Sequence, residues 1–413
     1  MAAAGDGDRL MKTAAVLPTP PPGRLLRATV IGVFAFCAAL FLFFPLAVGW
    51  ARGHFEHAVW SYNGASIALS YFETGFARRE LEATLIRPFT TDPMVGGAAF
   101  HALAYAALAA LAMAATLRAP MADRQRLAVG AVFLAVLFRV GADVGRADPA
   151  VMVCGLVAAW AARAGRFGTA AAAIAVALAL HEAGLIVLAP LVAGVAWENR
   201  AWRKAGRASR ALGLAVAVLA LAAYVLALLA RPDVAAAARV VHAKFAEPDM
   251  ADLSVYYTLS GSRGVASILC QQRLDGAYLG KVLKGAALIV LCTAGLRPRR
   301  WLTTLFAVLP PFLFLSAIAV DVARWTVFAA FAIAAMTTME PAADAKSRPP
   351  APLNSALAFL AAILMVAGVS FVDPLDPAPA VPNLMFGGRA MTLDALDRAS
   401  YCDPGWRRFL GLA

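Results

Sequence analysis

The chain has 413 residues, of which 62% are hydrophobic and only 15% are charged, and its mean hydropathy is +0.72. These values exclude a soluble globular domain, and the long alanine- and leucine-rich runs exclude a transmembrane β-barrel, whose strands would alternate polar and apolar residues. Much of the net charge of +12 lies in short basic clusters between apolar blocks, which is typical of cytoplasmic loops and does not indicate nucleic-acid binding.

Residues 1–27 are polar and proline-rich, which predicts a disordered cytoplasmic arm. The apolar block 28–50 follows; it is too long for a signal-peptide core and lacks a small-residue cleavage site, so we expect an uncleaved first helix. Further apolar blocks fall at residues 95–117, 127–140, 150–162, 168–197, 211–230, 282–296, 302–320, 325–339 and 355–372. The sequence therefore predicts an all-α, polytopic transmembrane helix bundle of about 10 or 11 spans within residues 28–372.

The block 168–197 is longer than one span needs, and it carries His181 and Glu182 at its middle. If it crosses the membrane once, the basic clusters at residues 200–210 and 297–300 fall outside. If it goes out and comes back, both clusters are cytoplasmic, as the positive-inside rule requires. The charge pattern favours a short helical hairpin with His181 and Glu182 at its outer tip; a single long tilted helix is the alternative.

With a hairpin there, the polar segments collect on the periplasmic side. The outer loops are residues 51–94 and 231–281, and the C-terminal tail 373–413 is periplasmic. Helices that are too short to span the bilayer alone are tolerated inside a bundle or beside water, so we expect an active cavity at this outer face.

The first motif of the outer face is "SYFETGFARRELEATLIRPF", which contains Arg78 and Arg79. Guanidinium groups bind phosphate oxygens bidentately, so a pair beside the membrane is suited to a lipid-linked phosphate or pyrophosphate. The alternative is that both arginines anchor an interfacial helix to anionic headgroups.

The second motif is the turn "DVGRADP", which contains Asp143, Arg146 and Asp148. Two carboxylates beside one arginine suit a catalytic base, Asp143, held by a cation next to a substrate. Alternatively, the turn neutralises itself, and Asp148 caps the helix that starts with Pro149.

His181 and Glu182 form the third motif. A carboxylate beside a histidine in a partly dry pocket is a candidate general base, although both side chains can also be satisfied by helix neighbours. Asp321 and Arg324 predict an ion pair at i, i+3 that either closes the cavity or binds substrate. No cysteine–histidine spacing predicts a metal site, and no nucleotide-binding loop or other cofactor motif is present.

Two of the five cysteines, Cys270 and Cys402, fall in segments assigned to the outer face. In an oxidising periplasm we expect them to form a disulfide that pins the tail over residues 231–281 as a lid. Two separate thiols are the alternative. The other three cysteines lie within apolar spans and are expected to be free.

Four short patterns carry a family resemblance: "YFETGFARREL", the G-R-x-D turn, "LHEAGLIVLAP" and "DVARW". Together they resemble polytopic bacterial envelope glycosyltransferases of the GT-C class and exopolysaccharide polymerases of the EpsG/Wzy type. Enzymes of the GT-C class carry an acidic catalytic residue, often an aspartate, in the first outer loop. This chain departs from that pattern, because the loop contains four glutamates, Glu56, Glu73, Glu80 and Glu82, and a single aspartate, Asp92.

The resemblance implies a multi-pass protein of the bacterial inner (cytoplasmic) membrane with a cytoplasmic N-terminus. It would transfer or polymerise a sugar from a polyprenyl-(pyro)phosphate donor to a glycan acceptor at the periplasmic face, without a cofactor. Two alternatives stay open, which are a lipid-linked glycan transporter or flippase and a non-catalytic envelope assembly protein.

Overall fold

The structure is a computed structural model, and every regular element in its described part is helical. The described residues are 23–52, 68–70, 81–142, 147–181, 183–229, 233–244, 249–260, 262–272, 276–318, 321–341, 351–367 and 397–411.

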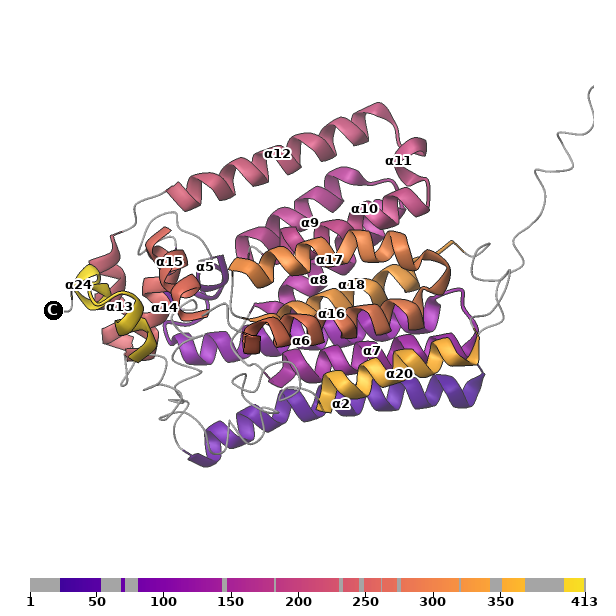
Figure 1. The fold of residues 1–413 in the computed structure, drawn as a ribbon, viewed down its shortest axis with the longest axis horizontal. Helices are drawn as coiled ribbons and strands as arrows, with labels where there is room; N and C mark the ends of the chain where they lie inside the picture. Colours follow the sequence, from indigo (N-terminus) through magenta and orange to yellow (C-terminus); the bar gives the residue numbers. More distant parts are fainter. Residues whose placement is uncertain are drawn as a thin grey trace, which may run out of the picture.

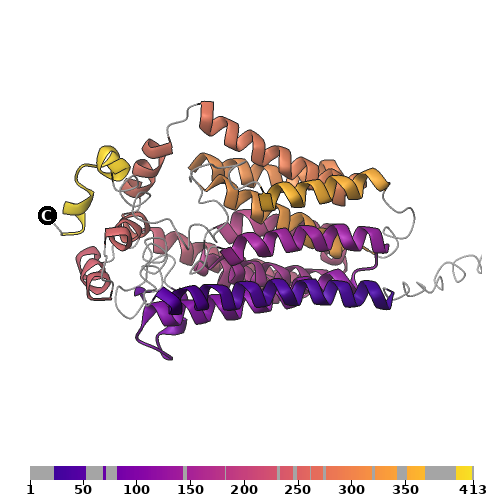
Figure 2. The same cartoon turned by 90° about the horizontal axis from the view of Figure 1, so that it is seen from below.

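Most of the helices run between two ends of one elongated bundle (Figures 1 and 2). Their cores are alanine and leucine, which lose little conformational freedom in a helix. These bundle helices are α2 (Arg24–Arg52), α6 (Pro93–Arg118), α7 (Asp123–Ala142), α8 (Asp148–Arg163), α9 (Phe167–Leu180), α10 (Ala189–Glu198), α12 (Arg207–Leu229), α16 (Gly276–Leu296), α17 (Trp301–Ile318), α18 (Val322–Thr338) and α20 (Pro352–Ala367).

The two ends differ in charge and in structure. One end carries the arginine-rich turns between α6 and α7, α8 and α9, α10 and α12, and α16 and α17; we call it the basic end. The short helix α11 (Ala201–Lys204) and the 3-10 turn η2 (Pro298–Arg300) lie there. The opposite end, which we call the disulfide end, carries the C-terminal segment and the helices outside the bundle (Figure 1).

Helix α18 is the centre of the bundle. Nearly all of its side chains are buried, and it packs against α7, α16 and α17. Alanines alternate with larger groups along it, so neighbouring helices approach closely; the ring of Phe331, for example, meets the edge of Phe133 on α7. A helix this buried holds polar groups at its two ends in fixed positions.

The block 168–197 doubles back on itself. The rings of Phe167 and Trp202, which flank this block, lie 4.9 Å apart, whereas one straight helix would separate them by about 50 Å. The chain leaves α9 at His181, passes through the π-helical turn η1 (Gly184–Leu188) and returns along α10. This is the hairpin expected from the charge pattern, and a single tilted helix is wrong.

Four helical segments in the described residues are long and apolar enough to cross a membrane: Val95–Arg118, Arg207–Leu226, Tyr278–Leu296 and Pro298–Ala317. Helix α12 is the most exposed of them, because only 6% of its apolar window is buried and it packs mainly against α9. Helix α2 already begins at Arg24, so the last residues of the predicted disordered arm are helical.

The segments predicted as outer loops contain further helices. Helix α5 (Leu81–Ile86) precedes α6, and α13 (Val234–Lys244), α14 (Asp249–Leu259) and α15 (Ser262–Gln272) lie between α12 and α16. Helices α13 and α14 form a separate small core with Ala68, Leu69 and the C-terminal segment, including α24 (Trp406–Phe409), and α15 packs against α14. The described residues between α12 and α16 are therefore largely helical rather than an open loop.

Candidate functional site

Arg324, in the first turn of α18, is the centre of a charged cluster at the disulfide end. Its Nε donates to Oδ2 of Asp148 at 2.7 Å, and its Nη2 donates to Oδ1 of the same carboxylate. The two side chains are only 13% and 5% exposed, so this is a largely desolvated, bidentate ion pair. Nη1 of Arg324 also lies 3.4 Å from Oδ2 of Asp321, which is the i, i+3 pair expected from the sequence.

Asp148 does not cap its helix. The N-cap position of α8 is Ala147, with no side-chain hydrogen bond to the helix, and Asp148 is the first helical residue. Its carboxylate is bound instead to Arg324, which lies 176 residues further along the chain. The capping interpretation of Asp148 is therefore wrong, and the residue links α8 to the central helix.

Trp325 connects the ion pair to the hairpin. The Cζ atom of Arg324 lies 5.2 Å from the centre of the buried indole ring, within the range of a cation–π contact. The imidazole of His181 lies 6.2 Å from the same ring. His181 itself is buried, so the hairpin turn reaches into the bundle beside α18.

The backbone at the turn holds His181 in one orientation. His181 is extended, with φ −163° and ψ 133°, and its Nδ1 accepts a hydrogen bond from the backbone N–H of Ala183 at 3.1 Å. A neutral imidazole with an acceptor at Nδ1 carries its proton on Nε2, so in that form His181 can donate a hydrogen bond from Nε2. The π-helical turn η1 follows directly, and such turns are frequent at functional sites.

Glu82 on α5 is, like Asp148, a buried carboxyl group at this end. It lies on the buried face of α5 with Ala83 and Ile86, and its Oε1 has no hydrogen-bond partner among the described residues. Burial, and to a lesser extent the negative charge of Asp148, raise the pKa of Glu82 to about 8. Glu82 therefore gains and loses a proton near neutral pH, next to the ion pair.

The sequence analysis named Glu82 only as one acid among several in its loop. A signal was present: Glu82 and Ile86 stand at i, i+4, so a carboxyl group lies on the apolar face of a short helix. Burial distinguishes Glu82 from Asp92, the other acid of this loop among the described residues, which is exposed.

The arrangement of the cluster is suited to acid–base chemistry more than to phosphate binding. The guanidinium of Arg324 is already engaged by Asp148 and Asp321, so its fork is not open to a phosphate in this state. Glu82 is the group suited to proton transfer. In the described residues no group of three or more histidine, cysteine, aspartate or glutamate side chains could hold a metal ion.

Of the predicted site residues, the structure places Asp148, His181, Asp321 and Arg324 at one end of the bundle. The predicted residues Arg78, Arg79, Asp143, Arg146 and Glu182 lie outside the described residues.

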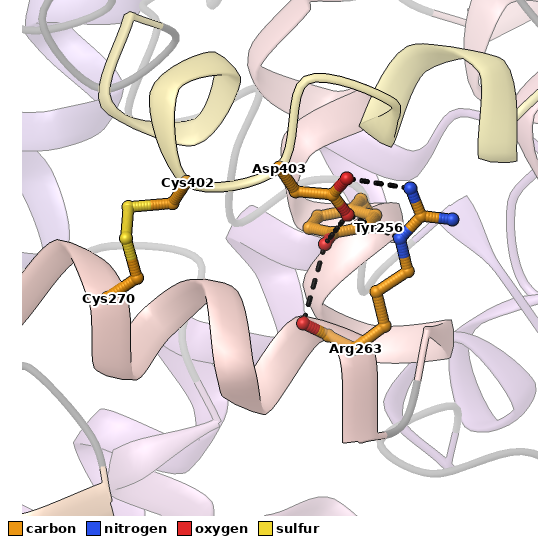
Figure 3. The surroundings of a disulfide bond; sticks show 5 residues. All are labelled: Tyr256, Arg263, Cys270, Cys402 and Asp403. Carbon is orange, nitrogen blue, oxygen red and sulfur yellow. Dashed lines mark hydrogen bonds and ion pairs between the residues drawn. A yellow bond between two sulfur atoms is a disulfide. The ribbon is translucent and has the colours of Figure 1, made fainter.

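The C-terminal segment is fixed to helix α15 by a disulfide between Cys270 and Cys402 (Figure 3). Their Cα atoms are 5.8 Å apart, and the pairing is the one expected from the sequence. Beside the disulfide, Asp403 receives a bidentate ion pair from Arg263 and a 2.6 Å hydrogen bond from the hydroxyl of Tyr256. Hydrogen bonding from Arg263 above all lowers the pKa of Asp403 to about 2.

Apolar contacts complete this attachment. Trp406 is buried next to Tyr256, and the guanidinium of Arg263 lies 5.3 Å from the ring of Phe409. We call residues 397–411 the C-terminal cap. It is a structured element that covers α14 and α15.

No protein-family model matches this chain. No curated protein and no solved structure matches it either. The likeness in short motifs therefore stays a resemblance, and the side-chain geometry carries the functional argument.

Proposed function

We propose that the chain is a multi-pass protein of the bacterial inner membrane with the basic end in the cytoplasm and the disulfide end in the periplasm. Four long apolar helices support insertion in a bilayer. The collection of basic turns at one end supports the orientation through the positive-inside rule. The bond between Cys270 and Cys402 at the other end is suited to an oxidising compartment.

At the periplasmic end we propose that the protein transfers or polymerises sugars carried on polyprenyl (pyro)phosphate. Glu82 takes the proton of an acceptor hydroxyl, whose oxygen attacks the anomeric carbon of the donor. The bond from that carbon to the phosphate oxygen breaks, and the (pyro)phosphate leaves with the electron pair. Arg78, Arg79 and Arg146, which the sequence analysis selected, would hold that leaving group.

The observation that carries this proposal is the position of Glu82. It is a buried carboxyl group on α5, close enough to Asp148 for that charge to raise its pKa, at the end that we assign to the periplasm. Enzymes of the GT-C class carry an acidic catalytic residue in the first outer loop, often an aspartate, and we propose that Glu82 takes this role here although it is a glutamate. Asp148 and Arg324 then act as positioning residues, because Arg324 holds the carboxylate of Asp148 in place and the charge of Asp148 raises the pKa of Glu82.

A transporter or flippase is the second candidate, and one observation favours it. The central helix α18 has an ion pair at each end: Arg324 with Asp148 at the disulfide end, and the buried Arg297 with Glu198 and Glu340 at the basic end. Paired charges at both ends of a buried helix are suited to two gates that open in turn.

The test is complementation of a strain that lacks the protein. Glu82→Gln should abolish the glycan and cause lipid-linked sugar to accumulate on the outer leaflet, where it is accessible to an impermeant oxidant such as periodate. Asp397→Asn, which removes an exposed carboxylate of the C-terminal cap, is the matched control and should restore the glycan. Lipid-linked sugar that accumulates only on the inner leaflet would support the transporter instead.

A further inference from the structure

Seven cations gather on two neighbouring turns of the basic end, between α8 and α9 and between α10 and α12. Ser209 joins these turns, because its hydroxyl donates to the carbonyl of Gly165 at 2.8 Å and accepts from the N–H of Phe167 at 3.3 Å. We call the cations the basic patch: Arg163, Arg166, Arg200, Arg203, Lys204, Arg207 and Arg210.

The charge of the basic patch is not neutralised within the described part of the chain. The sequence from residue 199 to residue 232 contains no aspartate or glutamate, and the first turn of α12 is without an acidic residue. The preceding acid, Glu198, is engaged by Arg297 and Arg300. A helix N-terminus favours negative charge, so the arginines at the start of α12 are placed where an external anion would stabilise them.

Tryptophans border the basic patch. Trp197 is 83% exposed, and Trp202 is also exposed but held in place by the edge of Phe167 and by Arg210, whose Cζ lies 5.9 Å from the indole centre. Arg200 adopts a left-handed conformation with φ 52°, which costs an arginine more than it would cost a glycine. Exposed indole rings beside cations are typical of the boundary between membrane and water.

Apolar surface begins where the basic patch ends. Helix α12 leaves the patch and exposes leucine and valine along most of its length, for example at Leu214, Val218 and Leu226. A soluble anion, a nucleic acid or an acidic protein would contact the basic patch but not this long apolar surface. A lipid can contact both, because it has a charged headgroup and apolar acyl chains.

We propose that the basic patch binds an anionic glycerophospholipid. The phosphodiester headgroup lies on the patch, Trp202 marks the level of the interface, and the acyl chains run along the exposed face of α12. The proposal rests on the proposed bilayer location of the chain but is independent of glycosyl transfer.

The experiment compares headgroup binding by the purified full chain in detergent. The probes are phosphatidylglycerol, phosphatidylcholine and inorganic phosphate, and retained lipid is counted by native mass spectrometry. Arg203→Gln combined with Arg207→Gln removes two charges from the patch. The matched control, Arg118→Gln with Arg124→Gln, removes two exposed charges from the turn between α6 and α7 at the same end. Thermal unfolding in detergent without lipid checks that both variants fold.

We expect the patch variant to bind phosphatidylglycerol about tenfold more weakly or worse, while the control changes less than about twofold. Raising the salt to about 0.5 M should bring the wild type close to the patch variant. Equal losses in both variants, or equal binding of phosphatidylcholine and phosphatidylglycerol, would overturn the site. Binding of inorganic phosphate that competes fully with phosphatidylglycerol would show a free-anion site and also overturn it. If the chain stays integral to the membrane while any of these results is obtained, the lipid site is wrong but the proposed location in the bilayer still holds.

Discussion

Replacing both Cys270 and Cys402 with serine should loosen the C-terminal cap without releasing it completely. The disulfide closes a loop with a sequence separation of 132 residues. For a free chain, the loop-entropy relation gives a stabilisation of about 5 kcal/mol at this length. Helices α16 to α20 lie inside the loop and already restrict its ends, so we expect about 2–4 kcal/mol instead.

The side-chain contacts that remain should keep the cap docked for most of the time. Burial of Trp406 contributes about 2–3 kcal/mol, and the hydrogen bond from Tyr256 to Asp403 contributes about 1–2 kcal/mol. The pair between Arg263 and Asp403 adds little, because the arginine side chain is 42% exposed.

Hydrogen exchange measured by mass spectrometry on the full chain in nanodiscs tests this reasoning. A loss of 2–4 kcal/mol corresponds to amide protection in residues 397–411 that falls about 30- to 700-fold. Cys37→Ser, which removes a thiol of α2, is the control and should leave the cap unchanged. Unchanged protection in the double serine variant would refute the reasoning, as would complete alkylation of Cys402 before any reductant is added.

Three further predictions follow from the charges. Arg324→Met should destabilise the fold by about 3–5 kcal/mol, because it leaves Asp148 buried without a partner. The double variant Arg324→Met with Asp148→Asn should recover more than half of this lost stability, as measured by thermal unfolding. Because the pKa of Asp403 lies below its ordinary value of 3.8, its contribution to cap docking is fully present above about pH 4 and is lost as the pH falls through about 2. The protection of the cap, measured as its exchange rate relative to the intrinsic rate at each pH, should fall across this window, and that of Asp403→Asn should change less. Reporter fusions at Ala205 and Gly295 should read cytoplasmic; a periplasmic reading at both would contradict the proposed orientation.

The features that the sequence predicts best depend on local patterns. The hairpin follows from the length of one apolar block and from the charges that flank it, and the pair of Asp321 with Arg324 follows from their i, i+3 spacing. The pairing of Cys270 with Cys402 follows from the compartment that the topology assigns to each cysteine. Each of these predictions needs only a neighbouring stretch of sequence or the side of the membrane to which a segment is assigned.

The features that the sequence does not predict depend on contacts between distant segments. Asp148 stands before Pro149, where a capping role is the natural expectation, and nothing local indicates that Arg324 is its partner. The burial of Glu82 likewise depends on how α5 packs against α6 and α9. The region 231–281 is predicted as a polar loop because its helices are short, and the core that α13 and α14 share also needs Ala68, Leu69 and the C-terminal cap.

The proposed glycosyl transfer depends most directly on Glu82, and the decisive measurement is the pH dependence of the reaction. Purified protein in proteoliposomes would be given lipid-linked sugar extracted from the strain that lacks it. The rate should rise with pH through about 8, because Glu82 acts as a base only after it loses its proton and its pKa is about 8.

Glu82→Gln should lower the rate by a factor of about 100 or more and remove the rise, while Glu82→Asp should keep a measurable rate whose midpoint is shifted. Thermal unfolding should show both variants folded. A Glu82→Gln enzyme with the wild-type rate and the same pH profile would contradict the account.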